Sequence, residues 1–148
     1  MTGAEKLAQW YFRLNGCLTI PNFVLHPVKP GSARTEIDII GLRFPKRREL
    51  SDGVIDDEPF AKQVHPCLWL AEVKTRYVSV NQSWVDNSGR NIESVVAAIG
   101  IVESEQAEDV ARSLSQRGTW SEGHRSCSLF FVGDCLSEEL RRQYPDVP

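Results

Sequence analysis

The sequence lacks several features that would place the protein in a specialised class. No apolar run approaches the roughly 18 to 20 residues that span a bilayer, and the first residues lack the basic-then-apolar order of a signal peptide. The four cysteines form no CxxC pair and the three histidines have no metal-ligand spacing, which disfavours a disulfide framework and a zinc site. No phosphate-binding loop, dinucleotide fingerprint or Ser or Cys nucleophile motif is present. We therefore expect a cytoplasmic protein that does not contact a membrane.

The sequence also has no strong excess of either charge. It contains 17 Lys and Arg residues against 20 Asp and Glu residues, a formal net charge of −3. Such a protein does not bind nucleic acid by bulk attraction, so a polyanionic partner must contact a local basic patch. The 148 residues, 41% hydrophobic and 25% charged, are typical of one ordinary globular domain.

Apolar periodicity predicts an α/β fold. A capping box of Thr2 and Glu5 predicts the start of a helix, and the apolar run near 67–75 indicates a central strand buried on both faces. This pattern favours a mixed central sheet flanked by helices in one domain, residues 1–148. Trp10 and Trp69 are expected in the core, and Trp84 and Trp120 in loops. The expected order is a helix near 4–14, strands near 17–25, 35–42 and 67–75, two helices separated near Gly100, a strand over 127–132 and a short helix capped by Ser137.

Residues 44–66 separate two of the predicted strands and show little periodicity. They contain a basic run, Lys46 to Arg48, followed by several acids. A loop of this length in a compact domain is usually functional or disordered. We interpret the segment as a loop insertion at about 44–66 rather than a linker between domains.

Charged side chains lie at the ends of two predicted strands. Glu72 and Lys74 close the apolar run, and they emerge together because residues two apart in a strand share a face. Asp38 lies between isoleucines of the preceding strand, where an ionised carboxylate needs a partner or an ion. In neighbouring strands the carboxylates of Asp38 and Glu72 would lie within several Å of each other. We therefore expect these three side chains to share one site.

This combination of side chains suits phosphodiester hydrolysis. Two carboxylates without a counter-ion repel each other, which favours protonation of one. Mg²⁺ prefers hard oxygen ligands, so Asp38 and Glu72 would suit this ion together with waters and a substrate phosphate. Lys74 would orient or deprotonate the attacking water and offset charge that grows on the phosphate. The sequence therefore predicts a metal-dependent phosphodiesterase.

The order of these charged residues resembles the signature of a known family. An acid in an opening helix, an acid in an isoleucine-rich strand and a final E-x-K are similar to the PD-(D/E)XK phosphodiesterase superfamily, which has the restriction-endonuclease-like fold. The likeness is to its Holliday-junction-resolvase and Mrr-type nuclease branches, and the segment 44–66 departs from the tight connection of compact resolvases. The motifs are Gly3 to Ala8 around Glu5, Glu36 to Gly41 around Asp38, and Leu70 to Thr75 around Glu72 and Lys74.

The resemblance implies a role for each residue of the motifs. Asp38 and Glu72 would bind Mg²⁺, or Mn²⁺ in its place, together with the main-chain carbonyl of Val73. Lys74 would position the attacking water. Glu5 would steer a water of the metal shell or help to hold a second ion, and its capping role stays open beside this one. The implied activity is that of a DNA endonuclease, and small nucleases of this kind often pair into homodimers to meet both strands.

Two other interpretations stay open. One is a catalytically inactive nucleic-acid-binding or protein-interaction module of a repair or defence assembly. The other is a structural domain in which Glu72 and Lys74 form an ordinary ion pair at a strand end. In the nuclease interpretation, basic side chains near the strand ends would contact the phosphate backbone. The expected nucleic-acid-binding residues are Arg43, Lys46, Arg47, Arg48 and Arg76.

Overall fold

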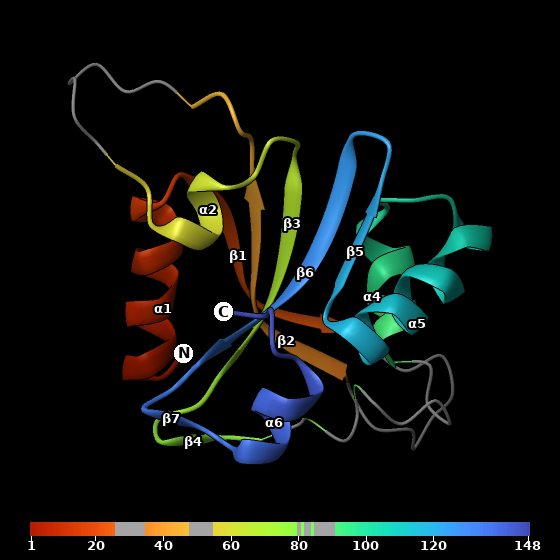
Figure 1. Cartoon of the computed structure of the whole chain (residues 1–148). Helices are drawn as coiled ribbons and strands as arrows, with labels where there is room; N and C mark the ends of the chain where they lie inside the picture. The colour runs from red at the N-terminus through yellow and green to blue at the C-terminus, as the bar shows by residue number, and fades with distance from the viewer. Residues whose placement is uncertain (26–34, 48–54, 80, 82–83, 85–90) are drawn as a thin grey trace.

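A five-stranded sheet forms the centre of the protein (Figure 1). The structure is a computed structural model, which describes residues 1–25, 35–47, 55–79, 81, 84 and 91–148. Strands β3 and β6 are parallel, whereas the other neighbouring strands are antiparallel, so the sheet is mixed as the sequence predicted. In order across the sheet, the strands are β1 (Cys17–Leu25), β2 (Thr35–Arg43), β3 (Cys67–Val73), β6 (Arg125–Val132) and β5 (Thr119–Glu122).

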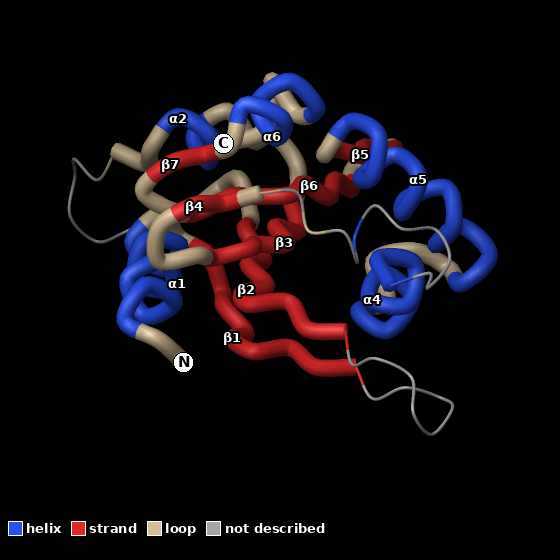
Figure 2. The backbone as a smooth tube through the Cα atoms, turned by 90° about the horizontal axis from the view of Figure 1, so that it is seen from below, coloured by secondary structure: helices blue, strands red, loops and turns tan. Residues whose placement is uncertain are grey.

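Helices cover both faces of this sheet, which confirms an α/β domain with flanking helices (Figures 1 and 2). One face carries α1 (Gly3–Leu14) and α2 (Glu58–Ala61), and the other carries α4 (Asn91–Ile99) and α5 (Ala107–Arg117). Within the described part of the chain, no helix has the length and hydrophobicity needed to cross a bilayer. The other elements that the structure describes are the short parallel strands β4 (Tyr77–Val78) and β7 (Cys135–Leu136), the 3₁₀ helix η1 (Ser104–Gln106) and α6 (Glu138–Gln143).

The central strand β3 is buried along its whole length. Trp69 and Ala71 belong to the apolar cluster under α1 and α2, whereas Leu68 and Leu70 belong to the cluster under α4 and α5. Successive side chains of a strand point to opposite faces, so an unbroken apolar run serves both clusters at once. The prediction of a central strand here is confirmed.

Helix α1 begins at its predicted cap and lies close to β2. Glu5 N–H donates to Thr2 Oγ1 at 3.3 Å, and Thr2 N–H donates to Glu5 Oε2 at 2.8 Å, which completes the capping box. A Cβ atom at Gly41 would lie 2.5 Å from Phe12 Cδ1. Only glycine therefore allows the helix and β2 to approach this closely.

The segment 44–66 is not a loop throughout, which corrects the prediction. Residues 58–61 form α2, and Phe60 is fully buried with its ring 5.4 Å from that of Phe12 and 5.3 Å from that of Trp69. A helix of one turn carries too few residues to show a period, so apolar periodicity could not predict it. Residues 48–54, which include Arg48, lie outside the described residues.

The positions of the tryptophans also differ from the prediction that Trp10 and Trp69 lie in the core and Trp84 and Trp120 in loops. Trp10 is 60% exposed, and Trp84 is buried in the core beside α4 and α5. Trp120 lies in β5 and is partly buried, while Trp69 is buried as expected. Helix α1 carries apolar side chains on most of its circumference, so periodicity alone could not show that it buries the side of Ala8 and Phe12.

Candidate active site

Asp38 and Glu72 lie at the same end of the β2–β3 pair. The antiparallel register pairs Ile39 with Ala71, and the next residues outward are Asp38 and Glu72. The charge of Glu72 acts on the pKa of Asp38, which shows that the two carboxylates share one environment. The structure thus brings together the two acids that the sequence assigned to one site.

Asp38 lies where the pairing of β2 is interrupted on both sides. Ile39 is the last residue of β2 that pairs with β3 at this end. On the other side, Ile37 and Ile39 pair with β1, but Asp38 and the opposite residue Asn22 do not. Asn22 has a positive φ of 51°. Asp38 Oδ2 accepts a hydrogen bond of 2.7 Å from the main-chain N–H of Val73. The N–H of Val73 lies beyond the last β2–β3 pair and needs a partner. Its hydrogen bond to Asp38 holds the carboxylate between the ends of the two strands.

The pKa of Asp38 is raised, mainly by burial. The hydrogen bond from the N–H of Val73 lowers this pKa, the charge of Glu72 raises it, the charge of Lys74 lowers it and the charge of Glu5 raises it. The carboxylate form of Asp38 is therefore disfavoured overall. A cation placed beside Asp38 would reverse that preference.

Glu72 is 3% exposed and uses both carboxylate oxygens. Lys74 Nζ lies 2.5 Å from Oε1, and Asn81 Nδ2 donates to Oε2 at 3.2 Å. A buried carboxylate requires such partners. Sequence reasoning missed Asn81, because it lies in a polar stretch without a motif and reaches Glu72 only through the fold.

Lys74 follows the last residue of β3, and its side chain is 49% exposed. Partial burial lowers its pKa, but the hydrogen bond and charge of Glu72, with the charges of Asp38 and Glu5, outweigh burial and raise the pKa. Lys74 is therefore protonated at neutral pH. It can donate hydrogen bonds and offset negative charge.

Glu5 approaches the same site from α1. Its charge contributes to the pKa of both Asp38 and Lys74. Its carboxylate is also engaged with Thr2 and lies 3.7 Å from the terminal amine of Met1. The capping role is confirmed, and a second role in the site stays a prediction.

The oxygen atoms that the sequence proposed as metal ligands are the carboxylates of Asp38 and Glu72 and the main-chain carbonyl of Val73. Lys74 and Asn81 contact the carboxylate of Glu72, and the N–H of Val73 contacts that of Asp38. No group of three or more His, Cys, Asp or Glu side chains that could hold an ion occurs among the described residues, so Glu5 does not complete a three-side-chain set. Mg²⁺ usually binds through one or two carboxylates, waters and substrate phosphates. The residues of the site therefore fit Mg²⁺ better than an ion bound entirely by protein.

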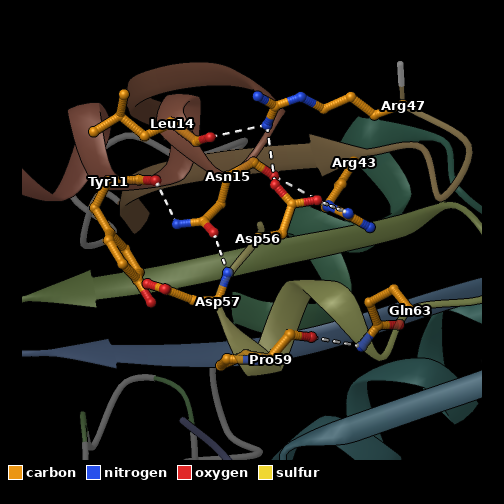
Figure 3. Close-up of polar contacts among 9 residues, drawn as sticks. All are labelled: Tyr11, Leu14, Asn15, Arg43, Arg47, Asp56, Asp57, Pro59 and Gln63. Carbon is orange, nitrogen blue, oxygen red and sulfur yellow. Dashed lines mark hydrogen bonds and ion pairs between the residues drawn. The ribbon is translucent and has the colours of Figure 1, made fainter. Parts of the chain in front are cut away.

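Two of the predicted phosphate-binding residues are engaged within the protein instead (Figure 3). Arg43 is 3% exposed, its Nε donates to the carbonyl of Asn15 at 3.1 Å and its guanidinium forms an ion pair with Asp56. Arg47 Nη1 donates to the carbonyl of Leu14 at 2.8 Å and lies 3.2 Å from Asp56 Oδ1. We call this group the arginine clamp, because it joins the chain after β2 to the end of α1.

The arginine clamp lies at the end of β2 that is remote from Asp38. Arg43 pairs with Cys67, the first residue of β3, and lies five positions along β2 from Asp38, about 17 Å at 3.3 Å per residue. Lys46 also follows this end, and it lines a pocket there. Among the predicted basic residues that the structure describes, Arg76 is the one near the carboxylate end; it is exposed and lies two residues beyond Lys74.

Comparison of the chain with protein-family models, curated proteins and solved structures finds no match.

Proposed function

We propose that the chain is a Mg²⁺-dependent nuclease of the restriction-endonuclease-like type, which hydrolyses phosphodiester bonds of DNA and accepts Mn²⁺ as a substitute. The observation that carries the proposal is the meeting of Asp38, Glu72 and Lys74 where β2 and β3 stop pairing. A buried carboxylate beside a half-buried one, with one flanking ammonium, is an arrangement that a divalent cation would stabilise.

In the proposed site, some residues would bind the metal ion and others would compensate charge. When bound, Mg²⁺ supplies a Lewis acid that polarises the phosphate and lowers the pKa of water. Asp38 and Glu72, with the carbonyl of Val73, would hold the ion. Lys74, which keeps its proton, donates hydrogen bonds to the attacking water or to a phosphate oxygen and offsets the charge that develops there. Asn81 holds the carboxylate of Glu72 in place.

The test is a cleavage assay on linear, supercoiled, branched and single-stranded DNA with Mg²⁺ or with EDTA. Asp38→Asn removes a charged ligand and Lys74→Ala removes the ammonium, so each should abolish Mg²⁺-dependent cleavage. Glu36→Gln is the matched control, because it removes an exposed acid from the same strand as Asp38 and should leave cleavage unchanged. Melting curves establish that each variant is folded. Equal cleavage by the wild type, Asp38→Asn and Lys74→Ala would contradict the mechanism.

A second candidate function is a catalytically inactive module that binds nucleic acid or protein in a repair or defence assembly. It is favoured by the internal partners of the charged groups, since Lys74 and Asn81 satisfy Glu72 and the arginine clamp withdraws two basic residues from the surface. Absence of both cleavage and thermal stabilisation with Mg²⁺ or Mn²⁺ would support this module and contradict the nuclease.

A further inference from the structure

A pair of histidines lies at the end of the sheet opposite Asp38 and Glu72. β3 and β6 are parallel neighbours in the sheet (Figure 1). His65 and His124 come shortly before these two strands, so both lie where the strands begin. Their Nδ1 atoms are 3.4 Å apart, and their ring centroids are 4.9 Å apart. The two residues are 59 positions apart in the sequence, so only the fold brings them together.

The sheet itself fixes the spacing of this histidine pair. The carbonyl of Pro66 accepts the main-chain N–H and the hydroxyl of Ser126, each at 3.2 Å. Pro66 directly follows His65, and Ser126 is two residues beyond His124. The two imidazoles are therefore attached to hydrogen-bonded neighbouring segments.

The separation of the two Nδ1 atoms suits a shared metal ion better than a direct hydrogen bond. Hydrogen bonds donated by nitrogen usually span about 2.7–3.2 Å, so 3.4 Å is long for such a bond. Two nitrogen ligands, each about 2.0–2.1 Å from a tetrahedral Zn²⁺, lie about 3.4 Å apart. The histidine pair already has the separation of two ligands on one ion.

The surroundings leave space for further ligands. Both histidines line a pocket of about 480 Å³, together with Phe44, Lys46 and Val64. Within the described part of the chain, no third His, Cys, Asp or Glu side chain joins the histidine pair to form a metal cluster. Lys46 also lines the pocket, so an anion bound together with the ion would offset the repulsion between the ammonium and the ion.

We propose that His65 and His124 bind a divalent transition-metal ion of the Zn²⁺, Ni²⁺ and Cu²⁺ class through their Nδ1 atoms, with solvent at the open positions. Imidazole suits these ions, whereas Mg²⁺ prefers oxygen ligands. This site is therefore separate from the carboxylate site, and it does not depend on the proposed nuclease function. Having two protein ligands, it binds an ion that exchanges with solvent rather than a closed structural ion.

Isothermal titration calorimetry of the full chain with Ni²⁺, in excess Mg²⁺, tests the proposal. A Cys135→Ser background removes the exposed thiol as a competing ligand. One ion should bind per chain, and His65→Ala and His124→Ala should each weaken binding at least as much as the loss of an outer-shell partner, about 10- to 100-fold. His26→Ala, which removes the third histidine of the chain, should bind Ni²⁺ like the parent protein.

A second measurement follows the imidazoles directly. In side-chain NMR spectra, Zn²⁺ should shift the ring signals of two of the three histidines with one dissociation constant, and His65→Gln should remove this response without changing the melting temperature. His65 and His124 are at least partly exposed, so neither replacement opens a core cavity. Absence of binding, binding that survives both His65→Ala and His124→Ala, or equal weakening by His26→Ala would overturn the proposal.

Discussion

The two ends of the β2–β3 pair both collect charged side chains, but they differ in how the charges are compensated. At one end, the pKa of Asp38 is raised by burial and by two other acids, and Lys74 opposes this only in part. At the other end, Arg43 and Arg47 share the carboxylate of Asp56 (Figure 3). The first end has an excess of negative charge, whereas at the other end two guanidinium groups face a single carboxylate.

This difference indicates which charges serve stability and which are available to a ligand. The arginine clamp also includes Asn15, whose Oδ1 accepts the N–H of Asp57 at 2.7 Å, so it fixes the chain that leads into α2. Asp38 and Glu72 carry partners that a cation could replace or supplement. Perturbed carboxylates of this kind are common at functional sites, whereas the carboxylate of Asp56 is held between two guanidinium groups of the protein itself.

The largest effect on stability is expected from Arg43→Ala. This change leaves Asp56 without its most buried partner, and breaking a buried ion pair costs about 3–5 kcal/mol. Urea denaturation would measure the loss in the free energy of unfolding. Arg47→Ala is the matched control, because the more exposed Arg47 should cost only about 1–2 kcal/mol. Equal losses for both variants would contradict the role given to Arg43.

Local patterns were sufficient to predict most of the elements. The caps of α1 and α6 depend on residues three positions apart, and Ser137 Oγ does accept the N–H of Leu140 at 3.1 Å. The run that forms β3 is apolar at nearly every position, so the sequence predicted its central place. Glu72 and Lys74 were also found locally, because charges at the end of such a run need a partner.

The pairings between distant segments could not be predicted in the same way. Arg43 looked like a surface cation at a strand end, and its partner Asp56 lies 13 residues further along the chain. Because β2 and β3 are antiparallel, the end of β2 that carries Arg43 lies beside the start of β3, far from Glu72. The contact of Asn81 with Glu72 depends on the fold for the same reason.

Asp38→Asn is expected to stabilise the protein, by a smaller amount than Arg43→Ala destabilises it. Because the folded state raises the pKa of Asp38, it holds the proton more tightly than the unfolded chain. The stability gained from this proton is fully present below the unfolded-state pKa of about 3.9, and it is lost as the pH rises through the raised folded pKa. The variant cannot lose a proton there, so its stability relative to the wild type should increase as the pH rises from about 4 through the raised folded pKa.

Melting curves in EDTA across this pH range would measure the difference, with Glu36→Gln following the wild type as the control. A variant less stable than the wild type at pH 7 would show that the hydrogen bond from Val73 outweighs burial and the neighbouring acids. The excess of negative charge around Asp38 and Glu72 would then not indicate a functional site.

The smallest effect is expected from Lys62→Ala, which breaks an ion pair in the same segment that the arginine clamp holds. Lys62 Nζ lies 2.7 Å from Glu58 Oε1, but the two side chains are 69% and 78% exposed. Exposed helix pairs of this spacing contribute about 0.3–0.5 kcal/mol, because water and salt screen them. Urea denaturation in low and high salt should show a loss of this size that shrinks with salt. A loss close to that of Arg43→Ala would mean that burial does not separate the arginine clamp from an ordinary surface contact.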